Sequence, residues 1–552
     1  MKKAAVLLLG GILAAGLMTG CGKSAENGKK AETEGRTTGA VTEEAGGEEA
    51  ANLNMEGFPI VNEKITMTVY GCRDQNHAPW NEVLTLNKYE DLTNIHMDYQ
   101  EVPADGFEEN KQLLFASNEL PDIFLKSDIK IDQIATYGVG SGQLMVLDDL
   151  IEKYAPNLSK IYEEYPQIKQ AVTAADGHMY TIPAIDISAT GSMGFKQWIN
   201  KTWLDKLGKD IPTNLEEFKD VLIAFRDGDP NGNGQADEIP LGIREPDSIY
   251  PLAGSFGLQF QMKDTYNIDE NGTVHNWLCD DAFKEYLIYL NDLYEEKLLW
   301  QDYYKNDRAA WRSNLAGEMY GAMYMPYSDV FVNCEEDYVG YKPLIGPNGD
   351  QMWTDATGSI SMLGSFALSN TCSNPEAAVR WVDYFYGAEG EMFFRYGIEG
   401  ETFDYDSNHV PHFKDEILNS PDGFMTALGK INLVPGGGFP CMITDNTDNV
   451  VAKGRYKEGG RLLLSERTKE AAAILVDYMP EKVYAKPTVS MEDMDRLNAI
   501  EQDIINYKKE AVAKFVIGEW GFDKWDEYCA TLEQIGIREL EGIYQKALDA
   551  TK

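Results

Sequence analysis

The sequence predicts an α/β protein organised in large lobes. Its 552 residues are too many for one hydrophobic core, because single cores stop growing at roughly 250–300 residues. Strand-like and helix-like segments alternate after residue 58, which is typical of a parallel sheet. Hydrophobic residues form 43% and charged residues 25% of the chain, as in globular proteins rather than disordered ones.

The first lobe is predicted from five successive segments. They are a strand at 63–72, a helix at 80–92, a strand at 95–103, a helix at 107–118 and a short strand at 120–125. Ligands of parallel sheets bind beyond the carboxyl ends of the strands. We therefore expect binding residues in GCRDQN (71–76) and in KSD (126–128).

A second unit is predicted to begin near Gly191. Thr213 and Glu216 have the spacing of a capping box at the start of a helix. From Met491 the chain has apolar residues at helical spacing, which predicts a mostly helical tail. The expected elements are a strand at 194–200, helices at 201–208 and 213–225, a strand within 318–330 that leads into a loop, and a strand, turn and helix over 365–387.

The charge of the chain restricts its partners. Its 90 acidic against 49 basic residues give a net charge of −41, which disfavours nucleic acid and anionic membrane surfaces. A neutral or cationic ligand fits this field best, although a buried arginine could still admit an anionic one.

The seven cysteines show no disulfide framework. They lie far apart, at 21, 72, 279, 334, 372, 441 and 529, without a CxxC pair or a metal-ligand spacing. Apart from Cys21, they could pair or stay free.

The N-terminus has the pattern of a secretory signal. Two lysines precede an apolar run from Ala4 to Met18, and LMTGC (17–21) looks like a bacterial lipobox. We expect a signal peptide at 1–20, a diacylglycerol on Cys21 and a flexible tether at 21–57. The alternative is an ordinary cleaved signal with a chance cysteine. The first interpretation places the protein on the extracellular face of the bacterial cell membrane, held by its lipid alone.

Four stretches of the body resemble a known family. They are residues 113–125, 198–241, 373–390 with 396–401, and 515–536. Together with the lipobox they are similar to family 1 extracellular solute-binding lipoproteins of carbohydrate ABC importers, in particular the large oligosaccharide-binding type that includes the alginate-binding proteins. The resemblance implies a class II periplasmic-binding-protein-like fold, in which two α/β lobes are joined by crossing hinge strands and close on a ligand between them.

The resemblance also implies lobes that are discontinuous in sequence. We expect crossings near 184–190, 363–370 and 430–442. The expected boundaries are 58–187 with 368–435 for lobe 1, and 188–367 with 436–552 for lobe 2.

The acidic stretch DGDPNGNGQADEIP (227–240) predicts a structural calcium site. One register is an EF-hand pattern that starts at Asp227, with Gly232 at the turn and Glu238 at the twelfth position. A second register, implied by the resemblance, starts two residues later, and we prefer it because oxygen-bearing side chains recur at every second residue. Its ligands would be Asp229, Asn231, Asn233, the backbone oxygen of Gln235, Asp237 and Glu238. The alternative is a solvated acidic turn.

Sugar sites combine aromatic faces with charged and amide groups that bond hydroxyls. The expected ligand contacts are residues that follow predicted strands, together with several tryptophans. For Trp198 a place in the core is as good an explanation as ligand contact. The candidates are Arg73, Asp74, Trp80, Lys126, Asp128, Trp198, Trp311, Tyr327 and Trp353.

The chain lacks the common catalytic motifs, among them GxSxG, HExxH and the phosphate-binding GxxxxGK[ST]. We therefore expect a monomeric, non-enzymatic lipoprotein that captures an oligosaccharide and passes it to the permease subunits of an ABC transporter. The alternatives are a cell-surface glycoside hydrolase, whose two carboxylates need only meet in space, and a glycan adhesin.

Overall fold

The computed structural model describes most of the chain after residue 51. The described ranges are 52–259, 265–269, 271–305, 307–326, 334–356, 358–407, 409, 411–444, 456–457, 461–462, 466–480 and 489–550. The predicted signal peptide, Cys21 and most of the tether lie outside them.

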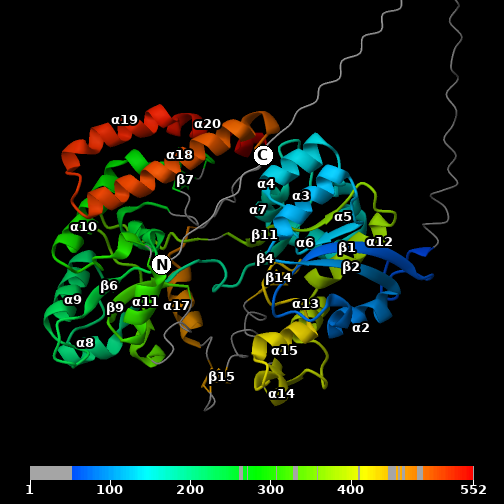
Figure 1. The fold of residues 1–552 in the computed structure, drawn as a ribbon, viewed down its shortest axis with the longest axis horizontal. Coiled ribbons are helices and arrows are strands. Elements are labelled where there is room, and N and C mark those ends of the chain that lie inside the picture. The colour runs from blue at the N-terminus through cyan, green and yellow to red at the C-terminus, as the bar shows by residue number, and fades with distance from the viewer. Residues whose placement is uncertain are drawn as a thin grey trace, which may run out of the picture. The chain divides into compact units, whose positions relative to one another are not determined.

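The first sheet has six strands in the order β14-β4-β11-β3-β1-β2 (Figure 1). β1 runs parallel to β2 and β3, so the predicted parallel arrangement is confirmed. β11 is antiparallel to both β3 and β4, and β14 is parallel to β4. The strands are β1 (Ile65–Arg73), β2 (Ile95–Pro103), β3 (Ile123–Leu125), β4 (Ile182–Asp186), β11 (Ile360–Leu368) and β14 (Met442–Ile443).

Helices bury both faces of this sheet because successive strand residues point to opposite sides. In β1, Val69 belongs to one hydrophobic cluster, and the next residue, Tyr70, belongs to another that includes Phe107 and Phe115 of α3. The helices that follow strands of this sheet or pack with it are α2 (Leu84–Thr93), α3 (Phe107–Ser117), α4 (Ile131–Gln133), α5 (Asp148–Tyr154), α6 (Pro156–Glu164), α7 (Pro166–Val172), α12 (Pro375–Asp383), α13 (Ala388–Tyr396), α14 (Asp415–Leu418) and α15 (Phe424–Ile431).

The second sheet has four strands in the order β10-β5-β9-β6. One hydrophobic cluster joins this sheet to the helices around it and to the C-terminal helices. The strands are β5 (Lys196–Asn200), β6 (Ile239–Gly242), β9 (Tyr320–Met325) and β10 (Tyr338–Gly340). The helices are α8 (Lys201–Leu207), α9 (Leu215–Asp227), α10 (Asp281–Glu295), α11 (Arg308–Ala316), α17 (Glu466–Val476), α18 (Met491–Val516), α19 (Trp525–Ile535) and α20 (Ile537–Ala550).

Three two-stranded hairpins lie outside the two large sheets. They are β7 (Tyr266–Ile268) with β8 (Val274–Asn276), β12 (Phe403–Tyr405) with β13 (Pro411–Phe413), and β15 (Tyr456–Lys457) with β16 (Arg461–Leu462).

The chain passes from one sheet to the other through residues 187–195 and returns through residues 341–359. A bridge between Met193 and Ala356 places these two passages side by side. After β14 the chain leads to α17, which packs against β10 of the second sheet. The exact lobe boundaries stay a prediction. The passages at 187–195 and 341–359 are where the chain crosses between the two sheets.

The predicted cap of α9 is wrong by one residue. Asn214, not Thr213, is the N-cap, and its side-chain oxygen accepts a hydrogen bond from the backbone N–H of Glu217 at 2.9 Å. Thr213 instead donates its own backbone N–H to the Glu217 carboxylate at 2.8 Å. The Asn214 side-chain oxygen and the Glu217 carboxylate thus each accept from a backbone N–H at the start of the helix. Asparagine is among the strongest N-cap residues.

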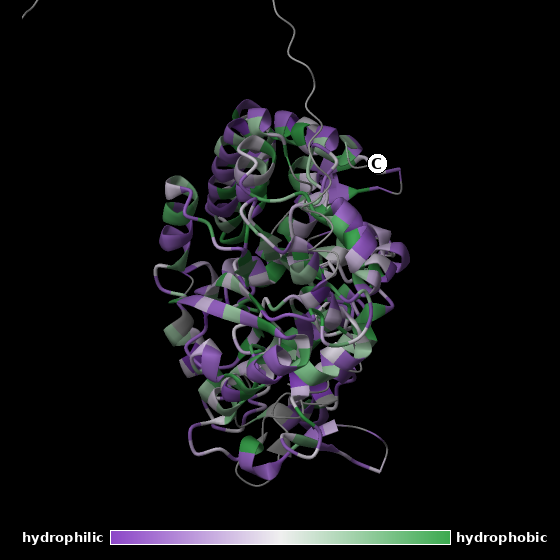
Figure 2. Cartoon of the chain, turned by 90° about the vertical axis from the view of Figure 1, so that its right-hand side faces the viewer, coloured by the Kyte–Doolittle hydropathy of each residue, from purple (hydrophilic) through white to green (hydrophobic). Residues whose placement is uncertain are grey.

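The described helices are amphipathic rather than membrane-spanning. Figure 2 shows hydrophilic and hydrophobic residues side by side along the helices, as expected where one face packs on a core. Within the described ranges, no helix combines the length and apolar character that crossing a bilayer requires.

Candidate ligand-binding site

Polar residues gather where β1 and β3 end. Because these strands are parallel, Arg73 with Asp74 and Lys126 with Asp128 come to the same edge of the first sheet. The structure therefore brings together the four residues that were predicted from these two strand ends.

Glu101 of β2 organises the end of β1. One carboxylate oxygen accepts from Arg73 Nη1 at 2.9 Å, and the other accepts from the backbone N–H of Trp80 at 2.7 Å. Asp74 accepts two hydrogen bonds from Asn76, both of 2.8 Å. Burial tends to raise the pKa of Asp74, but the bonds from Asn76 outweigh it, so the pKa lies below its usual range. Asp74 is thus a fixed anionic acceptor.

Lys126 holds a loop rather than facing solvent. Its side chain is almost fully buried, and Nζ donates to the carbonyl oxygens of Leu433 at 2.7 Å and Pro435 at 3.0 Å. Burial lowers the pKa of Lys126 to about 7. The loop it holds continues to Gly436, where a Cβ would lie 2.8 Å from the Cβ of Asp74. Lys126 therefore positions the backbone of residues 433–436, which packs against Asp74, and does not itself face the ligand site.

Asp128 lines a pocket at the same edge of the sheet. A cavity of about 350 Å³ is lined by the residues after β3, by Leu363 of β11 and by the first turns of α18. Its polar lining includes Asp128, Lys130 and Glu501. The volume is at the low end of small-molecule pockets, which start at roughly 300 Å³.

The second sheet presents a matching strand edge that sequence reasoning missed. β6 and β9 are parallel, and β6 is followed by Arg244, whose guanidinium lies 5.5 Å from the ring centroid of Phe195. Arg244 Nη2 pairs with Glu245 at 2.7 Å, while its Nε is buried without a hydrogen-bond partner. The partly exposed guanidinium beside an aromatic ring suits a sugar, because its N–H groups can donate to hydroxyl oxygens. Arg244 could have been found in the sequence, because it lies just after the strand-like segment EIPL (238–241). Finding it would have required the prediction of β6.

Tyr327 follows β9 at this second edge, but it lies outside the described residues. The four predicted tryptophans lie in the hydrophobic cores. Trp80, Trp198, Trp311 and Trp353 are 0%, 0%, 5% and 1% exposed. Their role as ligand contacts stays a prediction, and this placement does not support it.

The two passages between the sheets are tied together by Asp355. Its carboxylate accepts from the backbone N–H of Phe195, and its own backbone oxygen accepts from Gly194 N at 3.2 Å. Asp355 is 1% exposed, and burial raises its pKa to about 7. Lys196 adds bonds to the carbonyl oxygens of Thr190 at 2.8 Å and Met193 at 3.0 Å. The Phe195 ring and the connection between sheets are therefore positioned by one set of contacts.

The loop between α9 and β6 folds around the predicted calcium ligands. The side-chain amides of Asn231 and Asn233 donate to Asp237 at 3.2 and 3.1 Å. The side-chain oxygen of Asn233 accepts from the backbone N–H of Gln235 at 2.7 Å. Asp227 lies apart, since its carboxylate pairs with Arg226 at 2.8 Å. Several residues of the register that starts at Asp229 thus contact one another in this loop.

Glu238 shows that these residues fit a cation. Its Oε1 is buried and has no hydrogen-bond partner. Burial, with the nearby charges of Asp237 and Asp229, raises the pKa of Glu238. Among the described residues no group of three or more His, Cys, Asp or Glu side chains could hold a metal ion, so a site in this loop would need the amide and backbone oxygens as well. That mixture of hard oxygens is what calcium prefers.

Comparisons with known proteins agree with this architecture. The curated Streptococcus pneumoniae protein FusA, a fructooligosaccharide ABC transporter substrate-binding protein, is 28% identical over 522 residues, covering 90% of this chain and 93% of FusA. A solved FusA EF-hand mutant in complex with fructo-nystose superposes with a TM-score of 0.66 at 25% identity, covering 88% of this chain and 99% of that one.

A solved solute-binding protein of Bifidobacterium longum infantis, described as binding HMO, superposes with a TM-score of 0.73 at 24% identity, covering 88% of this chain and 99% of that one. It supports the two-lobe fold. The family described as bacterial extracellular solute-binding protein matches residues 75–392, more than half of the chain. The chain therefore belongs to the bacterial extracellular solute-binding protein family.

Proposed function

We propose that the protein captures an oligosaccharide outside the cell and delivers it to the membrane subunits of an ABC transporter. Family membership and the similarity to FusA support this function. The observation that carries it is that both sheets end their parallel strands in sugar-suited groups: the fixed acceptor Asp74 on one sheet, and Arg244 over Phe195 on the other. Hydroxyl groups need both acceptors and donors, and these two edges supply them.

Calorimetric titration of the body, residues 52–552, with neutral oligosaccharides tests this proposal. Fructooligosaccharides are the first probe because FusA is named for them. Saturable binding with the sugar recovered unchanged is expected. Shortened products would indicate a glycoside hydrolase, and binding of long polymer alone would indicate an adhesin; either result contradicts the proposal.

Arg244→Ala locates the site. Losing a charge-assisted hydrogen bond should weaken binding by about 10- to 150-fold, since such bonds contribute roughly 1.5–3 kcal/mol. Arg496→Ala is the matched control, because Arg496 is an exposed arginine of α18 paired with Glu539. Equal affinities of the two variants would remove Arg244 from the site.

We further propose that a lipid on Cys21 holds the protein at the membrane. The LMTGC pattern and the family's extracellular role support this anchor. Cys21→Ala should move the protein from the membrane fraction to the medium. A variant that stays in the membrane fraction would contradict the anchor.

We propose that calcium binds the 229–238 loop as a structural ion. The orphaned Glu238 oxygen supports it, as does the EF-hand named for FusA. Bound calcium would supply positive charge that offsets the buried carboxylate. Chelation should lower the melting temperature by about 3 °C or more, because an ion at 100 times its Kd stabilises by about 2.7 kcal/mol.

Glu238→Gln separates this effect from a general effect of the chelator. The variant should bind calcium more weakly and respond less to chelation, while sugar affinity is retained. Glu216→Gln, an exposed change in the first turn of the same region's helix α9, should respond like the unmodified protein. An unmodified protein that is indifferent to chelation would rule the ion out.

A further inference from the structure

Two cysteines that are distant in sequence meet in the second lobe. Cys279 ends the short helix η4 (Trp277–Cys279), and Cys529 lies in α19. Both are half-buried free thiols that pack against the same hydrophobic cluster, and the contact between the two thiols is the largest cause of the pKa shift of each. A disulfide bond would bring the two sulfur atoms to a separation of about 2.05 Å.

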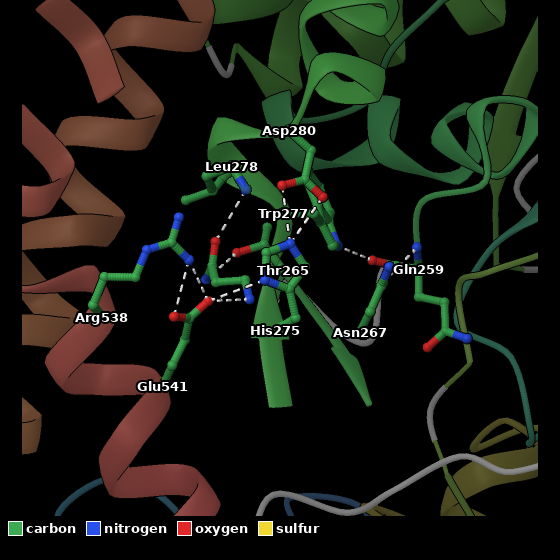
Figure 3. A network of polar contacts seen from close by, with 10 residues as sticks. Gln259, Thr265, Asn267, His275, Trp277, Leu278, Asp280, Arg538 and Glu541 are labelled. Atoms are coloured by element: carbon green, nitrogen blue, oxygen red, sulfur yellow. Dashed lines mark hydrogen bonds and ion pairs between the residues drawn. The ribbon is translucent and has the colours of Figure 1, made fainter. Parts of the chain in front are cut away.

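The segment that carries Cys279 is fixed to the C-terminal helix α20 by polar contacts (Figure 3). Glu541 of α20 accepts from the backbone N–H of Asn276 at 2.7 Å and pairs with His275 Nδ1 at 3.3 Å. His275 Nε2 in turn contacts Asp280 at 2.9 Å, and Arg538 holds Glu541 at 2.8 Å. These contacts lie on both sides of Cys279 in sequence. They fix its backbone relative to α20.

Aromatic packing fixes the other partner. Phe283 lies 4.9 Å from Trp277 and 6.2 Å from Trp525, measured between ring centroids. Trp277 belongs to η4, and Trp525 begins α19, so the two helices that carry the thiols share one aromatic contact chain. The two helices that carry the thiols are therefore held next to each other by the packed core.

We propose that Cys279 and Cys529 form a disulfide bond in the extracellular protein. The family is extracellular, and disulfides persist in oxidising surroundings. The bond would tie the C-terminal helices α19 and α20 to the segment that follows the β7–β8 hairpin. These helices are otherwise held only by non-covalent contacts in the described residues.

The chemistry is thiol–disulfide exchange with an external low-molecular-weight disulfide, RSSR. The Cys529 thiolate attacks one sulfur of RSSR, forms a mixed disulfide and releases the first RS⁻. Cys279 sulfur, after losing its proton, attacks the Cys529 sulfur of the mixed disulfide, which forms the protein disulfide and releases the second RS⁻. The two protons from the cysteines convert both leaving groups to RSH, so two thiols are oxidised and one disulfide is reduced.

The local electrostatics favour this order of attack. The hydrogen bond from Cys279 lowers the pKa of the Cys529 thiol, whereas the same bond, together with burial, raises the pKa of Cys279. Thiolate is the attacking species, so Cys529 is the better nucleophile of the pair.

Peptide mapping of the secreted protein under non-reducing conditions tests the proposal without any variant. A cross-linked pair of peptides containing Cys279 and Cys529, about 2 Da lighter than the two thiol peptides together, is expected. Of the six cysteines other than Cys21, four should react with an alkylating agent after denaturation without reductant. Six reactive thiols, or a link between other cysteines, would overturn it.

A thermal melt gives an independent measurement. Reductant should lower the melting temperature by about 2–6 °C, because the bond closes a long loop of the unfolded chain. Cys279→Ala, Cys529→Ala and the double variant should melt at similar temperatures and ignore reductant. Cys72→Ala, a change at another half-buried cysteine, should keep the response to reductant. A response that survives in the double variant would contradict the bond.

Discussion

Replacing Trp198 with alanine should lower the free energy of unfolding by about 3–5 kcal/mol. Trp198 is fully buried in β5 at the centre of the second core, where it pairs with Met323 of β9. Its indole Nε1 also donates to the Met325 carbonyl oxygen at 3.1 Å. The variant loses the packed ring and that hydrogen bond together. Urea unfolding of the ligand-free protein measures the loss.

A pair of phenylalanine variants separates the hydrogen bond from the packing. Trp353 is buried like Trp198, but its Nε1 has no hydrogen-bond partner. Trp198→Phe should therefore cost about 1 kcal/mol more than Trp353→Phe, the worth of one buried hydrogen bond. Equal costs would contradict that role of the indole. If the Trp198→Ala variant had unchanged stability but weaker sugar binding, Trp198 would be a ligand contact rather than a core residue.

Elements with a local signal were predictable. β2 coincides with its predicted span of 95–103, and α3 ends one residue before its predicted end at 118. In these segments the chain's own hydrophobic period and turn residues decide the structure. β6 was missed because it has four residues and is completed by pairing with β9, some 80 positions later. Arg244 was missed with it.

Residue type alone could not separate core from site. A tryptophan suits a buried core as well as a sugar ring, and only tertiary packing shows that Trp80 and Trp198 are inaccessible. Lys126 was identified from its position at a strand end, but its bonds go to a loop more than 300 residues later. Likewise, Cys279 and Cys529 carry no spacing signal, because only the tertiary packing of η4 and α19 around Phe283 brings their segments together.

Between pH 4 and pH 8 the protein should lose about 4 kcal/mol more stability than its Asp355→Asn variant. Burial raises the pKa of Asp355 from 3.8 to about 7, so the folded state keeps a proton that the unfolded state releases. The contribution of Asp355 to the free energy of unfolding is therefore fully present below pH 4. It decreases as the pH rises to 7 and no longer changes above that. Three pKa units correspond to about 4 kcal/mol.

Asparagine keeps the oxygen that accepts from Phe195 N and does not titrate, so the variant isolates the charge. Unfolding free energies from urea titrations at pH 4, 6 and 8 give the comparison. Asp404→Asn is the matched control, since it removes the same charge from a side chain that is 65% exposed. Its pH profile should run parallel to that of the unmodified protein. A pH profile of Asp355→Asn that is also parallel to that of the unmodified protein would contradict the prediction. It would mean that the pKa of Asp355 is not raised in the folded state, although burial of a charged carboxylate is unfavourable.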